Sequence, residues 1–133
     1  MTLSPTTCMV LFVSDVPKMT SFYRTIASMQ MLHEEADYAV LKIEGFELVI
    51  HAMHTDFTDN TSDHGIPKIR EDAYTKLCLP VRSLAAARQQ ANELGGAIKT
   101  REHEWGARGF RACDGHDPEG NVIQVRMSDN LEN

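Results

Sequence analysis

The stretch DGHDPEGNVIQV (residues 114–125) decides how the second half of this chain folds. Its centre, residues 117–121, has the form x-P-x-G-x, in which proline sets one backbone dihedral and glycine accepts a positive φ. The residues that follow are typical of a β-strand. The stretch therefore predicts a turn followed by a last strand, and this strand directs the side chains of Gln124 and Arg126 to one face of a sheet.

Composition restricts the class of protein before any motif is considered. The chain has 133 residues, 42% of them hydrophobic, and a formal net charge of -6. A domain of this size buries about two-thirds of its unfolded surface and needs no metal or disulfide to fold. The acidic balance argues against a nucleic-acid partner, and no apolar run of about 20 residues predicts a membrane span. Three cysteines outside any CxxC, and the lack of a signal-peptide pattern, favour a cytoplasmic protein with reduced thiols.

Hydrophobic patterning predicts the order strand, helix, strand, strand, strand, and this order occurs twice. The located elements of the first half are a strand at 8–13, a helix that begins after Ser14 or Asp15, and strands at 38–45 and 46–54. Those of the second half are a strand at 74–81, a helix that Ser83 caps and Gly95-Gly96 ends, and strands at 97–105, 109–115 and 121–127. We therefore expect a single domain made of module one (6–54), a connector (55–72) and module two (73–128).

Each predicted strand has one apolar face and one mixed face, because side chains alternate along a strand. The apolar faces are expected to pack on the helices. The mixed faces carry Cys8, Val10, Phe12, Glu47, Val49, His51, Met53, Lys76, Cys78, Pro80, Val122, Gln124 and Arg126. One interpretation is a face that meets solvent. We favour a ligand cavity, since apolar walls with a few polar groups are typical of binding pockets.

Three segments resemble the vicinal oxygen chelate superfamily, which includes glyoxalase I, bleomycin- and fosfomycin-resistance proteins and extradiol dioxygenases. LFVSDVPKMTSFYRTI (11–26) resembles its first strand and helix, HDPEGNVIQV (116–125) its D-P-x-G-N turn and last strand, and residues 74–99 the start of its second module. The resemblance implies an α+β fold of two βαβββ modules whose sheets form an open, barrel-like cup. It also implies a homodimer.

The resemblance also places four positions that hold a divalent metal in the catalytic members, one on each of four strands. Those positions, usually His or Glu, fall here on Cys8, His51, Lys76 and Gln124. A protonated lysine has no lone pair, and a neutral glutamine is a poor substitute for a carboxylate. We therefore expect no metal and no other cofactor. The alternative is a weakly held divalent metal that water or His54 completes.

We expect a glyoxalase/bleomycin-resistance-like protein that binds a small, anionic organic molecule in a metal-free cup between the two modules. Lys76 and Arg126 would supply the positive charge. The ligand-binding residues expected are Cys8, His51, Lys76, Gln124, Arg126 and, stacking at the mouth of the cup, Trp105. In the opposing interpretation, Lys76 pairs with Glu47 or another carboxylate and only fills an emptied metal site.

Two other classes of function stay open. The first is an enzyme of the same superfamily, a lyase, isomerase or dioxygenase. Its catalytic candidates are Cys8 and His51, acting through a divalent metal or through a Cys8 thiolate with His51 as base. The second is a structural or interaction protein with a collapsed cup. The sequence does not decide the ligand, its turnover, or whether one chain or two build each cup.

Overall fold

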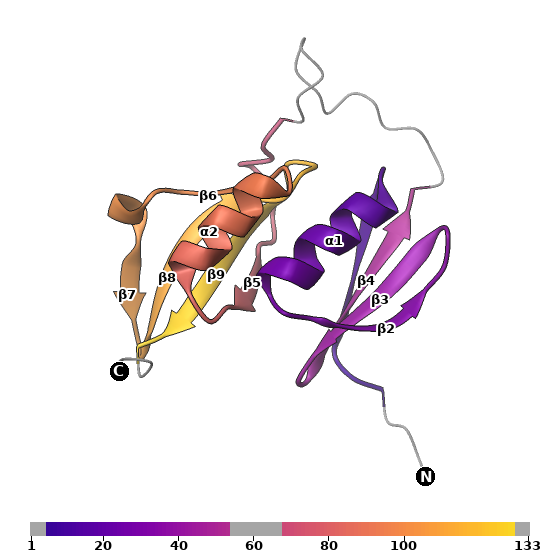
Figure 1. The fold of residues 1–133 in the computed structure, drawn as a ribbon, viewed down its shortest axis with the longest axis horizontal. Helices are drawn as coiled ribbons and strands as arrows, with labels where there is room; N and C mark the ends of the chain where they lie inside the picture. The colour runs from indigo at the N-terminus through magenta and orange to yellow at the C-terminus, as the bar shows by residue number, and fades with distance from the viewer. Residues whose placement is uncertain (1–4, 54–67, 130–133) are drawn as a thin grey trace.

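The computed structural model describes residues 5–53 and 68–129, which form two modules side by side (Figure 1). Module one contains β1 (Cys8–Val13), α1 (Val16–Ile26), β2 (Gln30–Glu34), β3 (Tyr38–Ile43) and β4 (Phe46–Ala52). Module two contains β5 (Leu77–Pro80), α2 (Leu84–Glu93), β6 (Ala97–Ile98), the 3₁₀ turn η1 (Arg101–His103), β7 (Trp105–Ala107), β8 (Phe110–His116) and β9 (Val122–Ser128). The expected α+β fold of two βαβββ modules is confirmed.

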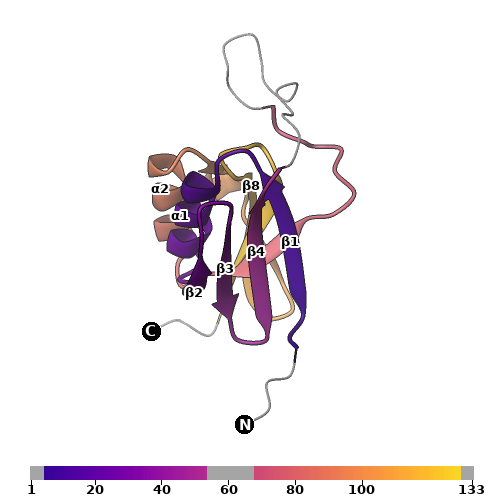
Figure 2. The same cartoon turned by 90° about the vertical axis from the view of Figure 1, so that its right-hand side faces the viewer.

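Each module builds its own sheet. The strand order is β1-β4-β3-β2 in module one and β5-β9-β8-β6 in module two, where β7 also pairs with β8. In both sheets the first strand runs parallel to the last strand of its module, and the other pairs are antiparallel. Both helices lie on the same side of the sheets (Figure 2). The opposite side is called the open face of each sheet below.

Capping residues set where the two helices begin. Asp15 caps α1 by accepting from the Lys18 N–H at 3.0 Å, and Pro17 lies in the first turn. Ser83 caps α2 by accepting from the Ala86 N–H at 3.0 Å. Side chains of this kind satisfy backbone donors that lack a partner inside the helix, so both starts can be read from sequence. No helix in the described segments is long and apolar enough to cross a membrane.

The core lies between the helices and the sheets, and the predicted apolar faces form it. Met19, Phe22 and Ile26 of α1 and Met29 just after it form a buried apolar stripe, each at most 4% exposed. The strand residues buried in this core include Val13, Leu41, Leu48, Ile50, Leu79, Ile98, Cys113, Ile123 and Val125. The mixed faces point the other way, and Val10 and Phe12 there are 47% and 54% exposed. The alternation of the strands therefore separates a core face from an open face as expected.

Three details differ from the sequence prediction. The strand expected from residue 74 begins at Leu77, and Tyr74 lies fully in solvent. The strand expected over 97–105 is interrupted by η1, and at this interruption the Arg88 guanidinium of α2 donates to the Lys99 carbonyl at 2.6 Å, so that this carbonyl does not pair with another strand. The sequence pattern does not indicate β2, because the residues of this strand are mostly exposed and show little apolar alternation.

The turn at residues 117–121 joins the two modules. Asp117 is completely buried, and its carboxylate accepts from the Tyr23 hydroxyl of α1 at 2.6 Å. The same carboxylate accepts from the backbone N–H groups of Glu119 and Asn121 and from the Asn121 side-chain amide. Burial raises the pKa of the Asp117 carboxyl, and burial together with the Asp117 charge raises the pKa of Tyr23 well above its ordinary value. The turn is thus a buried, hydrogen-bonded link to the first helix.

Two more contacts extend this link. The Glu119 carboxylate accepts from the backbone N–H groups of Ser14 and Asp15 at 2.8–2.9 Å, just before α1. Gly120 has φ +87° and accepts from the Arg70 N–H at 2.8 Å through its carbonyl. A Cβ there would collide with the Lys68 backbone carbonyl, so only glycine fits. The turn therefore positions α1, β9 and the chain entering module two together.

Candidate functional site

A chain of polar contacts crosses the open face of the module-two sheet. Lys76 Nζ lies 3.3 Å from Asp114 Oδ1, and the Gln124 amide donates to that same oxygen at 3.0 Å. Arg126 Nε donates to Gln124 Oε1 at 2.7 Å. Strand register creates this contact chain, because Gln124 on β9 is paired with Asp114 on β8. We call Lys76, Asp114, Gln124, Arg126 and Cys78 the polar network.

Cys78 and two aromatic rings border the polar network. Gln124 is paired with Cys78 on its other side, and Arg126 Nη2 donates to the Cys78 sulfur at 3.5 Å. The Arg126 guanidinium lies over the Phe110 ring, 4.5 Å from its centroid. The Trp105 ring contacts Phe110 edge-on at 6.1 Å and is 41% exposed. Stacking on Phe110 and hydrogen bonds on two sides hold the Arg126 side chain in one orientation.

A cavity of about 460 Å³ adjoins the polar network. Its lining contains the basic residues Lys76, Lys99 and His116, the acidic residues Glu71 and Asp114, and apolar walls from Ile69, Ile98 and Val122. This volume falls in the range of about 300–1,000 Å³ that is typical of small-molecule pockets. His116 Nδ1 donates to the Asp117 carbonyl at 3.0 Å, because a carbonyl oxygen can only accept. The hydrogen bond therefore requires a proton on Nδ1 of His116.

The expected ligand-binding residues divide between the two sheets. Lys76, Gln124 and Arg126 come together in the polar network, and Trp105 lies beside them through Phe110. Cys8 and His51 lie instead on β1 and β4, in the sheet of module one. Neither of these two lines the 460 Å³ cavity. Within one chain, the structure therefore assembles only the module-two part of the predicted site.

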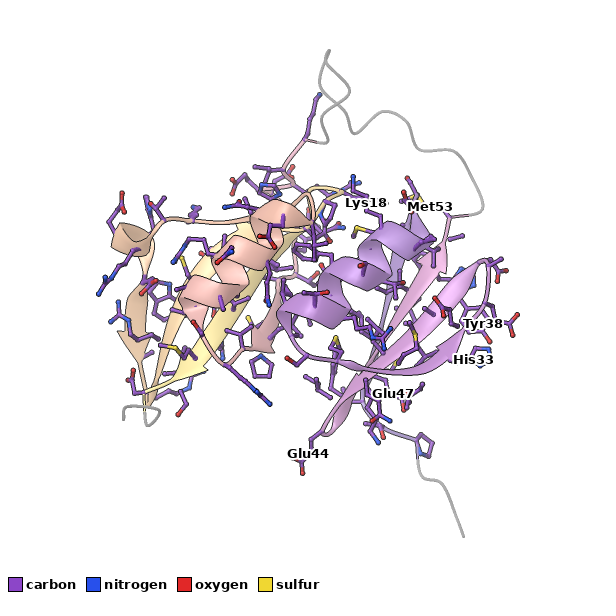
Figure 3. All side chains as sticks on the ribbon, in the orientation of Figure 1. Lys18, His33, Tyr38, Glu44, Glu47 and Met53 are labelled. Atoms are coloured by element: carbon purple, nitrogen blue, oxygen red, sulfur yellow. The ribbon has the colours of Figure 1, made fainter. Side chains whose placement is uncertain are left out.

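On the open face of module one, four rings form a row across the strands. The His51 ring contacts Phe12 at 5.8 Å and stacks on Tyr38 at 5.9 Å, and Tyr38 in turn contacts His33 at 5.1 Å. Figure 3 shows Tyr38 and His33 next to each other on this module. The His51 Nδ1–H donates to the Ala52 carbonyl at 2.8 Å. Cys8 is exposed at the start of β1.

Sequence reasoning did not identify Asp114, Phe110 and His116 as site residues. All three lie on the predicted strand or directly after it, at alternate positions that share one face of β8. This alternation could have placed them on the open face. It could not have paired Asp114 with Lys76, because strand register does not follow from the composition of one strand. Lys76 has a carboxylate partner in the structure, Asp114.

The residues at the four family metal positions do not fit a divalent metal. Gln124 Oε1 already accepts from the Arg126 guanidinium, and the nearest carboxylate, Asp114, is paired with the Lys76 ammonium. A cation there would meet two positive side chains and lose the neutral amide oxygen as a ligand. Within residues 5–53 and 68–129, no three side chains of His, Cys, Asp or Glu gather in a way that could hold a metal ion. We therefore derive no chemistry through a metal.

Comparison with known proteins identifies the fold. The family model described as the Glyoxalase/Bleomycin resistance protein/Dioxygenase superfamily matches residues 6–125. An integron cassette protein from V. cholerae is similar over 96% of this chain and 97% of its own, with 22% identity and a TM-score of 0.60. The fosfomycin resistance protein FosX from Listeria monocytogenes is similar over 96% of this chain and 95% of its own, with 15% identity and a TM-score of 0.63.

A third solved structure gives the same result. A glyoxalase/bleomycin resistance protein/dioxygenase family enzyme from Burkholderia phytofirmans is similar over 92% of this chain and 97% of its own, with 16% identity and a TM-score of 0.64. No curated protein sequence matches the chain. At these identities the solved structures bear on the fold alone, and the site has to be interpreted from the residues of this chain.

Proposed function

We propose that this chain, which belongs to the Glyoxalase/Bleomycin resistance protein/Dioxygenase superfamily, binds a small organic molecule with an anionic group on the open face of module two. One observation carries the proposal: the polar network borders a cavity of pocket size. Lys76 and Arg126 are two cations against the single carboxylate Asp114. The network therefore has a net positive charge in a protein of net charge -6.

Lys76 is the residue that would contact the anion. Its side chain is 40% exposed and lines the cavity, while Asp114 occupies one side of its ammonium group. An ammonium group has three donors, so Lys76 can keep Asp114 and still bind a ligand carboxylate. The hydrocarbon part of the ligand would contact the apolar walls, which include Ile98 and Val122. Burial of these apolar contacts would supply most of the binding free energy, and Lys76 would supply the orientation.

The proposed ligand cup also includes the open face of module one. Val10 and Phe12 expose large apolar surface on the open face of module one, which supports a partner surface there. We propose a homodimer in which the open face of module one in one protomer and the polar network of module two in its partner border one cup. Cys8 and His51 would then join the ligand site. Sedimentation equilibrium tests this arrangement: a monomer at micromolar concentration would rule it out.

The binding experiment uses named carboxylates as probes. Acetate, butyrate and benzoate would be titrated by calorimetry into the wild type, Lys76→Met and the control Lys18→Met, in which an exposed lysine on α1 is changed. We expect saturable binding that Lys76→Met weakens at least about tenfold, or about 1.4 kcal/mol, and that Lys18→Met leaves unchanged. Affinity that is equal in all three proteins would contradict the proposal.

A double variant separates two effects of the substitution. Lys76→Met alone leaves Asp114 without its cation, and an unpaired carboxylate would repel an anionic probe. Lys76→Met/Asp114→Asn removes both charges together. If the ammonium contacts the anion, the double variant stays as weak as the single one. Recovered affinity would show that Lys76 only neutralises Asp114, which is the opposing interpretation.

An enzymatic alternative has its own test. The Cys8 thiol is exposed, so it is accessible to an electrophile. The register of β1 and β4 places Cys8 opposite Glu47 and His51 opposite Phe12, so His51 is about 13 Å along the strands from Cys8 and cannot act as its base within one chain. A Cys8 thiolate activated in another way would react with iodoacetamide faster than a free thiol, and a Cys8→Ala variant would lose this labelling. A labelling rate equal to that of a free thiol would remove covalent catalysis. Turnover of an excess of ligand, rather than stoichiometric protection, would distinguish an enzyme from a binding protein.

A further inference from the structure

A second cavity lies where the end of α1 meets the ends of β5 and β9. It has a volume of about 290 Å³, and its lining includes Arg82, Arg126, Ser28 and Ser128 together with apolar atoms of Pro80 and Val81. Among the described residues that line it there is no Asp or Glu. Two guanidinium groups and hydroxyl groups, without a lining carboxylate, make this cavity electropositive on a protein of net charge -6. The cavity shares no lining residue with the one that Lys76 borders.

Strand pairing places the two arginines at this cavity. Pro80, the last residue of β5, is paired with Arg126 on β9, and Arg82 follows two positions later, just outside the strand. The Val81 N–H donates to the Arg126 carbonyl at 2.8 Å, which ties this segment to β9. The side chains of Arg82 and Arg126 are therefore presented from neighbouring backbones. Both residues line the same cavity.

Arg126 is preorganised to bind an anion. Its Nε and Nη2 atoms are committed to Gln124 and Cys78, and its plane rests over Phe110. These contacts fix the guanidinium, so little side-chain entropy is lost when another of its N–H groups binds an oxyanion. Arg82 is exposed and supplies a second guanidinium from solvent. One fixed and one adaptable arginine are well suited to an oxyanion with several acceptor oxygens.

Ser28 lines the cavity and has an unusual backbone conformation for a serine. Its φ is +51°, and among the described residues it is the only residue other than glycine with a positive φ. It stands directly after the C-cap of α1, where the Met29 N–H donates to the Arg24 carbonyl at 3.1 Å. Glycine is the usual residue at such a position because it adopts this conformation without steric cost. A serine therefore costs stability there, and its side chain lines the cavity.

We propose that this second cavity binds a phosphate-type dianion, held by Arg82, Arg126 and the Ser28 hydroxyl. Two guanidinium groups balance two negative charges, and their N–H groups match the several oxygens of a phosphoryl group better than the two oxygens of a carboxylate. The cavity is shallow and open, so it fits a terminal phosphoryl group of a larger molecule. This site shares Arg126 with the polar network, but it shares no lining residue with the cavity beside Lys76.

To test the proposal, inorganic phosphate is titrated into the protein at constant ionic strength. Binding is measured by calorimetry and by shifts of the backbone amide NMR signals of residues 28 and 82. Arg82→Gln is expected to weaken phosphate binding at least about tenfold. Arg101→Gln changes an exposed arginine on η1 in the same way and is expected to leave the affinity unchanged. Lys76→Met is also expected to leave it unchanged, which separates this site from the Lys76 site.

Ser28→Gly gives an independent readout. Glycine relieves the left-handed conformation, so the melting temperature should rise while phosphate binding weakens. A structural role for Ser28 alone would not combine these two changes. The proposal is overturned if wild type shows no saturable phosphate binding, if Arg82→Gln and Arg101→Gln bind phosphate equally, or if acetate binds as tightly as phosphate. A Ser28→Gly variant with undiminished affinity would remove Ser28 from the site.

Discussion

Replacing Tyr23 with phenylalanine tests the buried link between the modules. The substitution removes one hydroxyl and leaves the ring, which is 1% exposed, in place. The lost contact is the 2.6 Å hydrogen bond to the Asp117 carboxylate, and Asp117 itself has no exposure to solvent. Hydrogen bonds to charged groups contribute about 1.5–3 kcal/mol. We therefore expect Tyr23→Phe to lower the free energy of unfolding by about 2 kcal/mol at neutral pH.

The same substitution should have a pH dependence of definite sign. Burial raises the folded-state pKa of Asp117 above its unfolded value, while the bond from Tyr23 opposes that rise. Between those two pKa values the folded state binds the proton more tightly, so stability falls as pH rises through this window. Tyr23→Phe raises the folded pKa further and makes the fall larger. The stability difference between wild type and variant therefore grows from about 1 kcal/mol near pH 4 to its full value at pH 7.

The assay is urea unfolding followed by circular dichroism at both pH values. Tyr74→Phe is the matched control, because Tyr74 is fully exposed and loses no protein contact. We expect the control to stay within about 0.5 kcal/mol of wild type. Two results would refute the reasoning: a Tyr23→Phe effect no larger than that of the control, or an effect of the same size at pH 4 and pH 7.

Three further predictions concern other parts of the molecule. Gly120→Ala should lower the free energy of unfolding by about 2 kcal/mol or more, because the added Cβ collides with the Lys68 carbonyl at a residue of positive φ. Thermal unfolding measures this effect. Gly109→Ala is the control, because Gly109 also has a positive φ but has open space around the Cβ, so it shows the cost of the backbone conformation without the collision. Glu104→Gln should destabilise the fold by about 1–3 kcal/mol. Burial opposes ionisation of Glu104, but the positive charges of Arg88 and Arg111 outweigh burial and lower its pKa. The stability that ionised Glu104 contributes should therefore be lost as pH falls through that pKa. Unfolding of wild type and variant between pH 3 and pH 7 measures this loss. Incubation with Zn²⁺, Ni²⁺, Mn²⁺ or Fe²⁺ followed by desalting should leave far less than one metal per chain by mass spectrometry; one equivalent would contradict our interpretation of the site.

The link that Tyr23 tests also explains why the 117–121 turn is so densely bonded. Asp117 binds the first helix, Glu119 binds the backbone before that helix, and Gly120 binds the chain entering module two. Breaking one of these contacts loosens the position of one module against the other. Because β9 starts from the same turn, the positions of Gln124 and Arg126 depend on it as well.

Local patterns in the sequence determined much of this protein. Ser83 was identifiable as a cap, and the cap of α1 was limited to Ser14 or Asp15, because capping depends on residues three positions apart; the structure shows that it is Asp15. The alternation along β1, β4 and β9 separated core from open face because side chains alternate in every strand. The resemblance to a superfamily rested on the same short segments, and it carried the order of the modules.

Only the tertiary structure decided which open-face residues meet. Asp114 became the partner of Lys76 and Gln124 through the register of β8 against β9, and register is set by pairing between distant segments. Cys8 and His51 have the expected side-chain direction, but their strands lie in the other sheet. The cavity at Ser28 and Arg82 likewise exists only because a helix end and two strand ends meet in space. Periodicity is a local property, whereas these sites depend on how the modules pack.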